Sequence, residues 1–201
     1  MTQIAEDNRV GVRDLLDGIE QTSPLGRMET WPAGLRTTLG TVLASPSQIA
    51  LFWGPDYIAL YNDAYAPTIG NKHPDAFGQP AREYWSELWD DLRPLLDQVK
   101  DSGEPVFMKD RPFYIERFGQ PETVTFDISY SPVKDEDGRI TGVLCLVNET
   151  TERTASERRL RESEERFRNM ADHAPVMMWV TDADGRCTYL NRRWYEFTGQ
   201  T

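Results

Sequence analysis

The sequence predicts an α+β fold: a five-stranded antiparallel sheet with helices on one face. Two short strand candidates occupy 49–53 and 57–61, a helical stretch follows them, and three longer candidates occupy 106–116, 123–131 and 140–147. Turn-rich segments separate the last three, and antiparallel strands need only short turns, whereas parallel strands need a crossover. We also expect a helical extension before the sheet and a long charged helix after it.

Composition and charge exclude several classes of protein. At 201 residues and 39% hydrophobic content, the chain is long enough to bury a core. The net charge of -11 argues against nonspecific binding to nucleic acid or to an anionic membrane. No apolar run approaches the ~20 residues of a membrane-spanning helix, and the N-terminus has no secretory signal pattern. We expect a cytoplasmic protein.

Two helices are expected before the sheet. Apolar residues at helical spacing predict a short amphipathic helix over 10–21. In the next helix Pro32 suits the first turn, and an apolar stripe follows at Leu35, Leu39, Val42 and Leu43. Residues 1–46 are therefore predicted to form the helical extension.

The first two strands are predicted to form a hairpin. They are rich in aromatic and β-branched residues and flank the turn Gly54-Pro55-Asp56. Asn62 is a good helix cap, and loop residues follow at 70–74.

A second helical signal precedes the three longer strands. Asp91 is predicted to cap this helix, with Pro94 in its first turn and Gly103 at its end. Its apolar face comprises Leu92, Leu95, Leu96 and Val99.

After the last strand comes a highly charged helix. Residues 152–168 contain five Glu and six Arg, and several pairs have Glu four residues before Arg, the favourable order. Apolar side chains are few, at Leu160, Phe167 and Met170. These three are the expected seam of a weak coiled coil through which two copies form a homodimer.

The chain also contains an internal repeat. Asn62, Tyr65 and Gly70 have the same spacing as Asn191, Trp194 and Gly199. Only 28 residues remain from Ala174, too few to close a core. We therefore expect a second unit that begins here, and a sequence that is a piece of a longer protein.

Several motifs resemble those of PAS domains. Glu165-Arg166-Phe167-Arg168, Ala174-Pro175 and the Asp182–Gly185 turn look like the opening of a PAS domain, and residues 148–153 resemble the exit motif. The first unit is similar to the N-terminal PAS domain of many bacterial sensor histidine kinases. The motifs behind this similarity are Ser23-Pro24-Leu25-Gly26, Trp31-Pro32, Trp53-Gly54-Pro55, residues 60–65, Lys72-His73-Pro74 and Ser129-Tyr130-Ser131-Pro132. The exit motif departs from the usual Asp-Ile-Thr, since Glu149 and Thr150 replace Asp and Ile.

The resemblance implies a noncatalytic sensory and dimerisation module of a two-component system, with the catalytic domains of a histidine kinase elsewhere. The expected parts are an extension (1–46), a PAS domain (47–151), a signalling helix (152–171) and the start of a second PAS domain (172–201). Signals would pass through a hinge formed by Asn148, Glu149, Thr150, Thr151, Glu152 and Arg153. Two alternatives stay open: the sensor of a cyclic-dinucleotide cyclase or phosphodiesterase, and a ligand-free scaffold for protein contacts.

Reactive side chains give little sign of catalysis or metal binding. Cys145 and Cys187 have no partners at zinc-ligand spacing, and His73 stands alone in its loop, which argues against haem. The Asn-Cys-Arg motif of light-oxygen-voltage domains is absent, which argues against covalent flavin photochemistry. His173 is followed by Pro175 and is interpreted as a domain-entry residue rather than a phosphoacceptor.

Aromatic residues from the strands and helices could line a cavity for a small ligand. The alternative is a core filled by these same side chains. The candidates are Phe52, Tyr61, Tyr65, Trp85, Trp89, Phe107, Phe113, Phe126, Tyr130 and Cys145. Alternation along strands means that about half of the strand residues must point outward, and the sequence names no particular cofactor.

Overall fold

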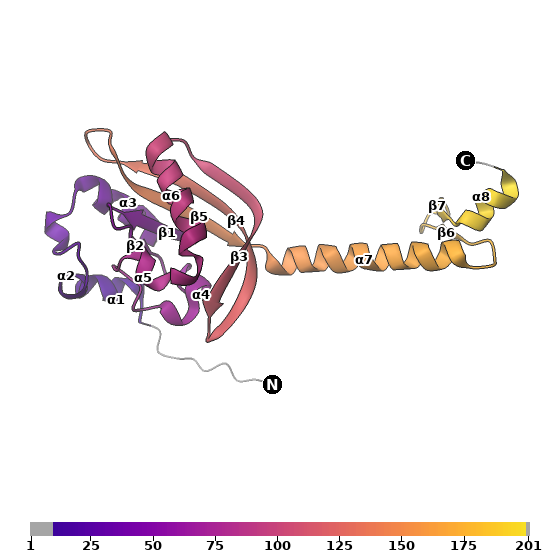
Figure 1. The fold of residues 1–201 in the computed structure, drawn as a ribbon, viewed down its shortest axis with the longest axis horizontal. Coiled ribbons are helices and arrows are strands. Elements are labelled where there is room, and N and C mark those ends of the chain that lie inside the picture. The colour runs from indigo at the N-terminus through magenta and orange to yellow at the C-terminus, as the bar shows by residue number, and fades with distance from the viewer. Residues whose placement is uncertain (1–9, 200–201) are drawn as a thin grey trace. The chain divides into compact units, whose positions relative to one another are not determined.

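The computed structural model describes residues 10–199. The first nine residues, for which no secretory signal is predicted, and the last two lie outside this range. The chain divides into a first unit that ends at Thr151 and a second that begins at Glu152 (Figure 1). No helix among residues 10–199 is both long enough and apolar enough to cross a membrane.

The first unit begins with short helices and one longer helix. Two strands, a group of helices and three further strands then follow. The elements before the first hairpin are α1 (Val12–Asp17), α2 (Ile19–Thr22), η1 (Met28–Thr30) and α3 (Ala33–Ala44). The hairpin strands β1 (Gln48–Trp53) and β2 (Ile58–Tyr61) are followed by α4 (Ala66–Ile69), η2 (Gly70–Lys72), α5 (Ala81–Tyr84), η3 (Ser86–Leu88) and α6 (Trp89–Ser102). The last strands are β3 (Val106–Arg117), β4 (Gln120–Lys134) and β5 (Ile140–Glu149).

These strands form one five-stranded sheet in the order β2-β1-β5-β4-β3. Every neighbouring pair is antiparallel, and β5 lies in the centre between β1 and β4. The predicted five-stranded antiparallel fold is therefore confirmed. Because β5 is central, both of its edges are hydrogen-bonded as far as Val147, and β4 alone pairs with it from there to its end at Glu149.

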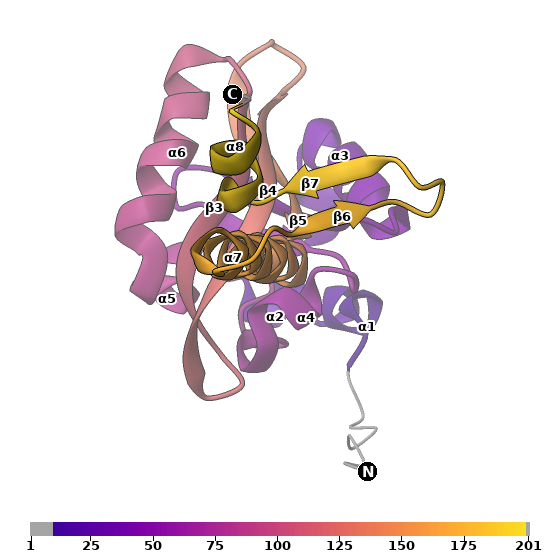
Figure 2. The same ribbon diagram turned by 90° about the vertical axis from the view of Figure 1, so that its right-hand side faces the viewer.

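Helices cover both faces of the sheet in different places. Phe52 on β1 points toward the α4–α6 side, where its ring lies 5.9 Å from that of Trp85. Its neighbours Leu51 and Trp53 point the opposite way but are also buried. α3 contacts β1 and β2 there, and Figure 2 shows α6 on one side of the strands and α3 on the other. The sequence predicts this helix without placing it on the second face.

The long helix of the middle differs from its prediction at the start. α6 begins at Trp89 with Leu88 as its N-cap, because the 3-10 turn η3 runs directly into it. Pro94 consequently lies inside the helix and not in its first turn. The bond it cannot donate would go to Asp90, and both residues are exposed, so water can reach the freed carbonyl. The end is as predicted: Gly103 has φ 74° and its N–H donates to Val99 O.

The turn between β3 and β4 is tighter than the sequence indicates. The sequence predicts strands over 106–116 and 123–131, but only Phe118 and Gly119 lie between the observed strands, both with positive φ, as a type I′ hairpin turn requires. Pro121 is part of β4. It lies beyond the stretch that pairs with β5, which starts at Phe126, so its missing N–H breaks no ladder bond there.

Asn62 fastens the hairpin to the end of α3. Its side chain is 2% exposed, and Oδ1 accepts the N–H groups of Ile49 (3.2 Å) and Tyr65 (3.1 Å). Nδ2 donates to three carbonyl oxygens, those of Val42 (3.1 Å), Ser45 (2.9 Å) and Ser47 (2.7 Å). The prediction that Asn62 caps the next helix is wrong, because α4 begins at Ala66 with Tyr65 as its N-cap; Asn62 instead bonds the turn before that helix and holds the entry into β1.

The second unit consists of α7 (Thr151–His173, whose first residue belongs to the first unit), a hairpin and a short helix. The hairpin strands β6 (Trp179–Thr181) and β7 (Cys187–Leu190) are antiparallel, and α8 (Arg192–Thr198) follows them. Many of its apolar side chains are exposed, including Trp179 at 61% and Phe197 at 77%. Ala171 and Asn191 are its fully buried residues among those described.

Candidate functional site

A small cavity lies between the sheet and the helices α4 to α6. Its volume is about 50 Å³. A water molecule takes about 30 Å³ of liquid volume, and pockets for drug-sized ligands have about 300–1,000 Å³. The core is therefore nearly filled by its own side chains, with room left for a water or a very small molecule.

Six of the ten predicted cavity residues line this space. They are Phe52, Tyr65, Trp85, Phe113, Phe126 and Tyr130. Phe113 and Phe126 face each other with ring centroids 6.3 Å apart. The strands therefore bring the expected aromatic side chains together on the inner face.

The other four predicted residues are placed elsewhere. Phe107 is 68% exposed, because it pairs with Ser129 on the outer face of the sheet. Trp89 packs against Tyr57 (6.1 Å between rings) outside the cavity. Tyr61 and Cys145 are buried but do not line the cavity. The rings of Tyr65 and Phe77 pack around Tyr61, and Cys145 lies on the central strand between its neighbours.

Three polar residues line the cavity that the sequence does not predict there: Thr68, Lys72 and Glu116. Thr68 Oγ1 is buried, and no described residue offers it a hydrogen bond. An orphaned hydroxyl beside a cavity suits a bound water or a small hydrogen-bonding molecule. Lys72 forms an ion pair with Glu87, in which both side chains are 17% exposed.

The reactive side chains are occupied by structural contacts. Burial raises the pKa of the Cys145 thiol to about 12, so it is protonated near neutrality. The His73 ring lies with Nδ1 3.2 Å from the Tyr61 hydroxyl and Nε2 2.9 Å from Val10 O. Among residues 10–199, no three His, Cys, Asp or Glu side chains are grouped so as to hold a metal ion.

The hinge joins β5 to α7 through a single residue, Thr150. Arg117 forms a two-pronged ion pair with the carboxylate of Glu149, at 2.9 and 3.1 Å, and also pairs with Glu122. These pairs raise the pKa of Arg117, and the hydrogen bonds that its guanidinium donates to Glu149 contribute most. Thr150 is 2% exposed and its N–H donates to Thr125 O at 2.8 Å. The end of β5 is thus held to β3 and β4 at the point where the helix begins.

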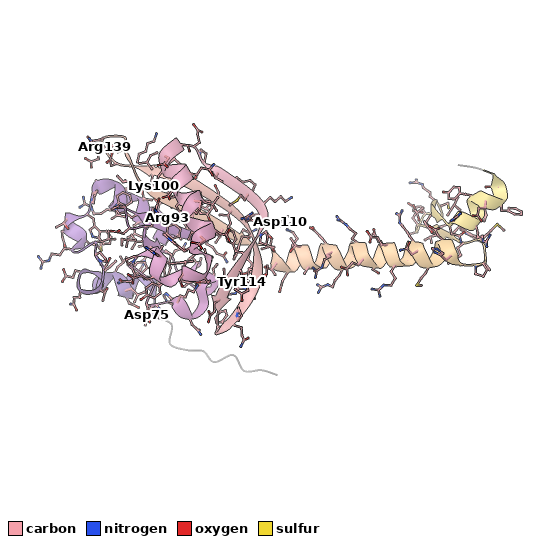
Figure 3. The ribbon with its side chains drawn as sticks, in the orientation of Figure 1. Asp75, Arg93, Lys100, Asp110, Tyr114 and Arg139 are labelled. Carbon is pink, nitrogen blue, oxygen red and sulfur yellow. The ribbon has the colours of Figure 1, made fainter. Side chains whose placement is uncertain are left out.

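A bulge in β3 gives the hinge a second attachment. Asp110, labelled in Figure 3, has φ 51° and its N–H donates to Asp127 Oδ1 at 2.8 Å. Its carboxylate accepts the Thr150 hydroxyl at 2.8 Å. Further along the hinge, Glu152 lies in the first turn of α7 and Arg153 pairs with Glu157 at 3.4 Å. Asn148 pairs with Asp127 in the ladder and is exposed.

The three predicted seam residues of α7 differ in their surroundings. Leu160 and Met170 are 63% and 67% exposed. Phe167 packs within the second unit, its ring 5.4 Å from that of Tyr189. Leu160 is therefore the better position at which to test the seam, because Phe167 also packs within the second unit.

Comparison with known proteins identifies the fold family. Residues 44–155, more than half of the chain, match the family described as PAS fold. The chain belongs to the PAS family. Residues 165–201 match a further family described as PAS domain. A curated relative of this PAS protein, the uncharacterized protein y4lL of Sinorhizobium fredii, is 47% identical over 66 residues. Those residues are 33% of this chain and only 8% of that protein.

Several solved structures resemble this chain at low sequence identity. The PAS domain of BvgS from Bordetella pertussis is 23% identical with a TM-score of 0.47, over 65% of this chain and 96% of that one. A sensory box sensor histidine kinase from Vibrio cholerae is 19% identical with a TM-score of 0.43, over 58% and 93%. An RNA-binding light-oxygen-voltage receptor is 17% identical with a TM-score of 0.47, over 73% of this chain and 41% of that one.

Proposed function

We propose that this chain is a noncatalytic sensory and dimerisation module of a cytoplasmic signal-transduction protein, with a histidine kinase as the parent. The observation that carries the proposal is the junction of β5 and α7. The central strand ends at Glu149, the helix starts at Thr151, and the Arg117–Glu149 ion pair spans the sheet at this point. A change in the sheet would therefore reach a charged helix through one residue.

We further propose that residues 172–201 begin a second PAS domain, preceded by the signalling helix 152–171. Asn191 supports this, because its hydrogen bonds repeat those of Asn62. Each Nδ2 donates to carbonyls 20 and 15 residues earlier, and each Oδ1 accepts the N–H 13 residues earlier. The end of α7 is thus bonded to this hairpin through Asn191, as the end of α3 is bonded to the first hairpin through Asn62.

A second candidate function is a scaffold for protein contacts that binds no ligand. The cavity of about 50 Å³ favours it, because this volume leaves no room for a flavin or haem as the side chains stand. The orphaned Thr68 hydroxyl favours a small polar ligand instead. Native mass spectrometry of the purified chain separates the two: a bound small molecule supports sensing, and its absence supports the scaffold.

The dimer is tested by the mass of the chain in solution at high concentration. We expect a dimer that Leu160→Glu converts to a monomer, because Leu160 is an exposed seam residue. Asn169→Glu is the matched control, since it adds the same charge to an exposed position off the seam. A wild-type chain that is monomeric at high concentration contradicts the helix-pair mechanism.

A further inference from the structure

One short segment, residues 68–72, touches both the cavity and the strand that holds the hinge. Thr68, Ile69 and Lys72 line the cavity. Gly70 has φ 56°, and a Cβ placed on it would lie 2.9 Å from Arg117 Cβ. A residue with a Cβ would not fit here, so the backbone of Gly70 packs directly against β3, and movement of this segment toward β3 would press on Arg117.

A polar connection runs parallel to this steric one. Lys72 pairs with Glu87, and Glu87 Oε1 accepts the N–H of Glu116 at 3.3 Å. Glu116 directly precedes Arg117. The end of β3 is therefore fastened to the cavity wall at two consecutive residues.

Arg117 in turn holds the hinge. Its side chain is only 13% exposed and points to the inner face, like Ile115 two residues earlier. The guanidinium spans β4 and binds both oxygens of Glu149, the last residue of β5. A planar guanidinium held at two oxygens transmits both position and orientation.

We propose that Arg117 is a positioning residue that conveys displacement of residues 68–72 to Glu149, and thereby to the start of α7. This rests on the proposed sensory function. A molecule entering the cavity at Thr68 would push residues 68–72 against Arg117, and the ion pair would shift the end of β5. Arg117 touches no ligand in this mechanism and acts only through Gly70 and Glu149.

The test is a double-mutant cycle on the whole chain, read by amide hydrogen exchange over residues 148–156. Thr68→Phe places a ring that exceeds the cavity and so stands in for an occupant. We expect it to accelerate exchange at the hinge by about threefold or more, and to have less than about half of that effect when combined with Arg117→Met, the extent of coupling usual within one network. Arg117→Met keeps the chain that packs on Gly70 and removes the guanidinium.

Arg111→Met is the matched control, because Arg111 lies on the same strand and pairs with Asp91 rather than with the hinge. The Thr68→Phe effect should persist in that background. Exchange over residues 48–53 reports global unfolding, and Thr68→Leu supplies a milder occupant where Thr68→Phe fails to fold. An equal effect with and without the Arg117 guanidinium, or no effect at the hinge in either, overturns the proposal. The cycle uses neither a ligand nor dimerisation, so its failure leaves the sensory proposal to its own test.

Discussion

Asn62 and Asn191 share three side-chain hydrogen bonds at the same sequence separations, to carbonyls 20 and 15 residues earlier and from the N–H 13 residues earlier. Asn62 is 2% exposed and Asn191 is fully buried. Each side chain bonds the end of a helix and the start of the hairpin that follows it. A buried amide with this many partners contributes to stability chiefly because its removal leaves several backbone groups unsatisfied.

Asn62→Ala should lower the free energy of unfolding of the first unit by about 2–4 kcal/mol, since the backbone groups of Ile49, Val42 and Ser45 lose their partner. Hydrogen exchange over residues 48–53 in a urea series measures this. Asn191→Ala is the control: it should accelerate exchange over residues 178–181 and leave residues 48–53 unchanged. A change under about 0.5 kcal/mol for Asn62→Ala, the usual size of a surface substitution, would count against the role of the network.

Gly70→Ala and Gly54→Ala form a matched pair of substitutions. Both glycines have positive φ, but a Cβ at Gly54 meets no described atom within 4 Å, whereas one at Gly70 meets Arg117 Cβ at 2.9 Å. Gly54→Ala should cost about 1–2 kcal/mol of backbone strain, and Gly70→Ala about 1–3 kcal/mol more from overpacking. Urea unfolding measures both. Equal losses would mean that residues 68–72 can move away from Arg117 freely.

Stability should fall in alkaline solution because of Cys145. Burial raises the pKa of its thiol from 9.0 to about 12. Since the folded value is the higher one, this contribution is complete below pH 9 and is lost as the pH rises toward 12, by at most about 1.4 kcal/mol per unit. Urea unfolding at about pH 8.5 and 10 should show a shallower loss for Cys145→Ala. Cys187 is exposed, so Cys187→Ala should keep the wild-type slope; a shared slope for all three proteins contradicts the assignment.

Local sequence signals predict most of the fold. The stripe of α3 is buried at Leu35, Leu39 and Val42, and Gly103 closes α6 in the left-handed conformation that glycine favours. The order of strands and turns also leads to the antiparallel sheet. These features depend on residues within a few positions of one another, which the pattern of a sequence records.

The lining of the cavity is only partly predictable, because it depends on which way each strand faces. Phe107 points outward while its neighbours Val106 and Met108 pack on the core, and the irregular pairing after Met108 shifts the alternation. Aromatic content alone cannot separate these positions. Polar residues such as Thr68 enter the site from α4, whose single turn leaves no periodic signal.

The partners of the hinge could not be predicted from local pattern. Glu149 is separated from Arg117 by 32 residues, and Thr150 from Asp110 by 40. The sequence places Glu149 in the predicted hinge, but nothing near it in the sequence indicates Arg117 as its partner. The close approach of Gly70 to Arg117 likewise arises only after the sheet has formed.

The most direct test of the account is the effect of Glu149→Gln on hydrogen exchange at the start of α7, compared with Glu122→Gln. Both carboxylates pair with Arg117, but only Glu149 ends β5. We expect Glu149→Gln to weaken the hinge by about 1 kcal/mol and to accelerate exchange over residues 151–156 about fivefold, because solvent screens part of the energy of this pair, whose side chains are 13% and 30% exposed. Glu122→Gln should change exchange by less than about twofold. Equal exchange in both variants, whether fast or unchanged, would contradict the claim that the Arg117–Glu149 pair links the sheet to the helix.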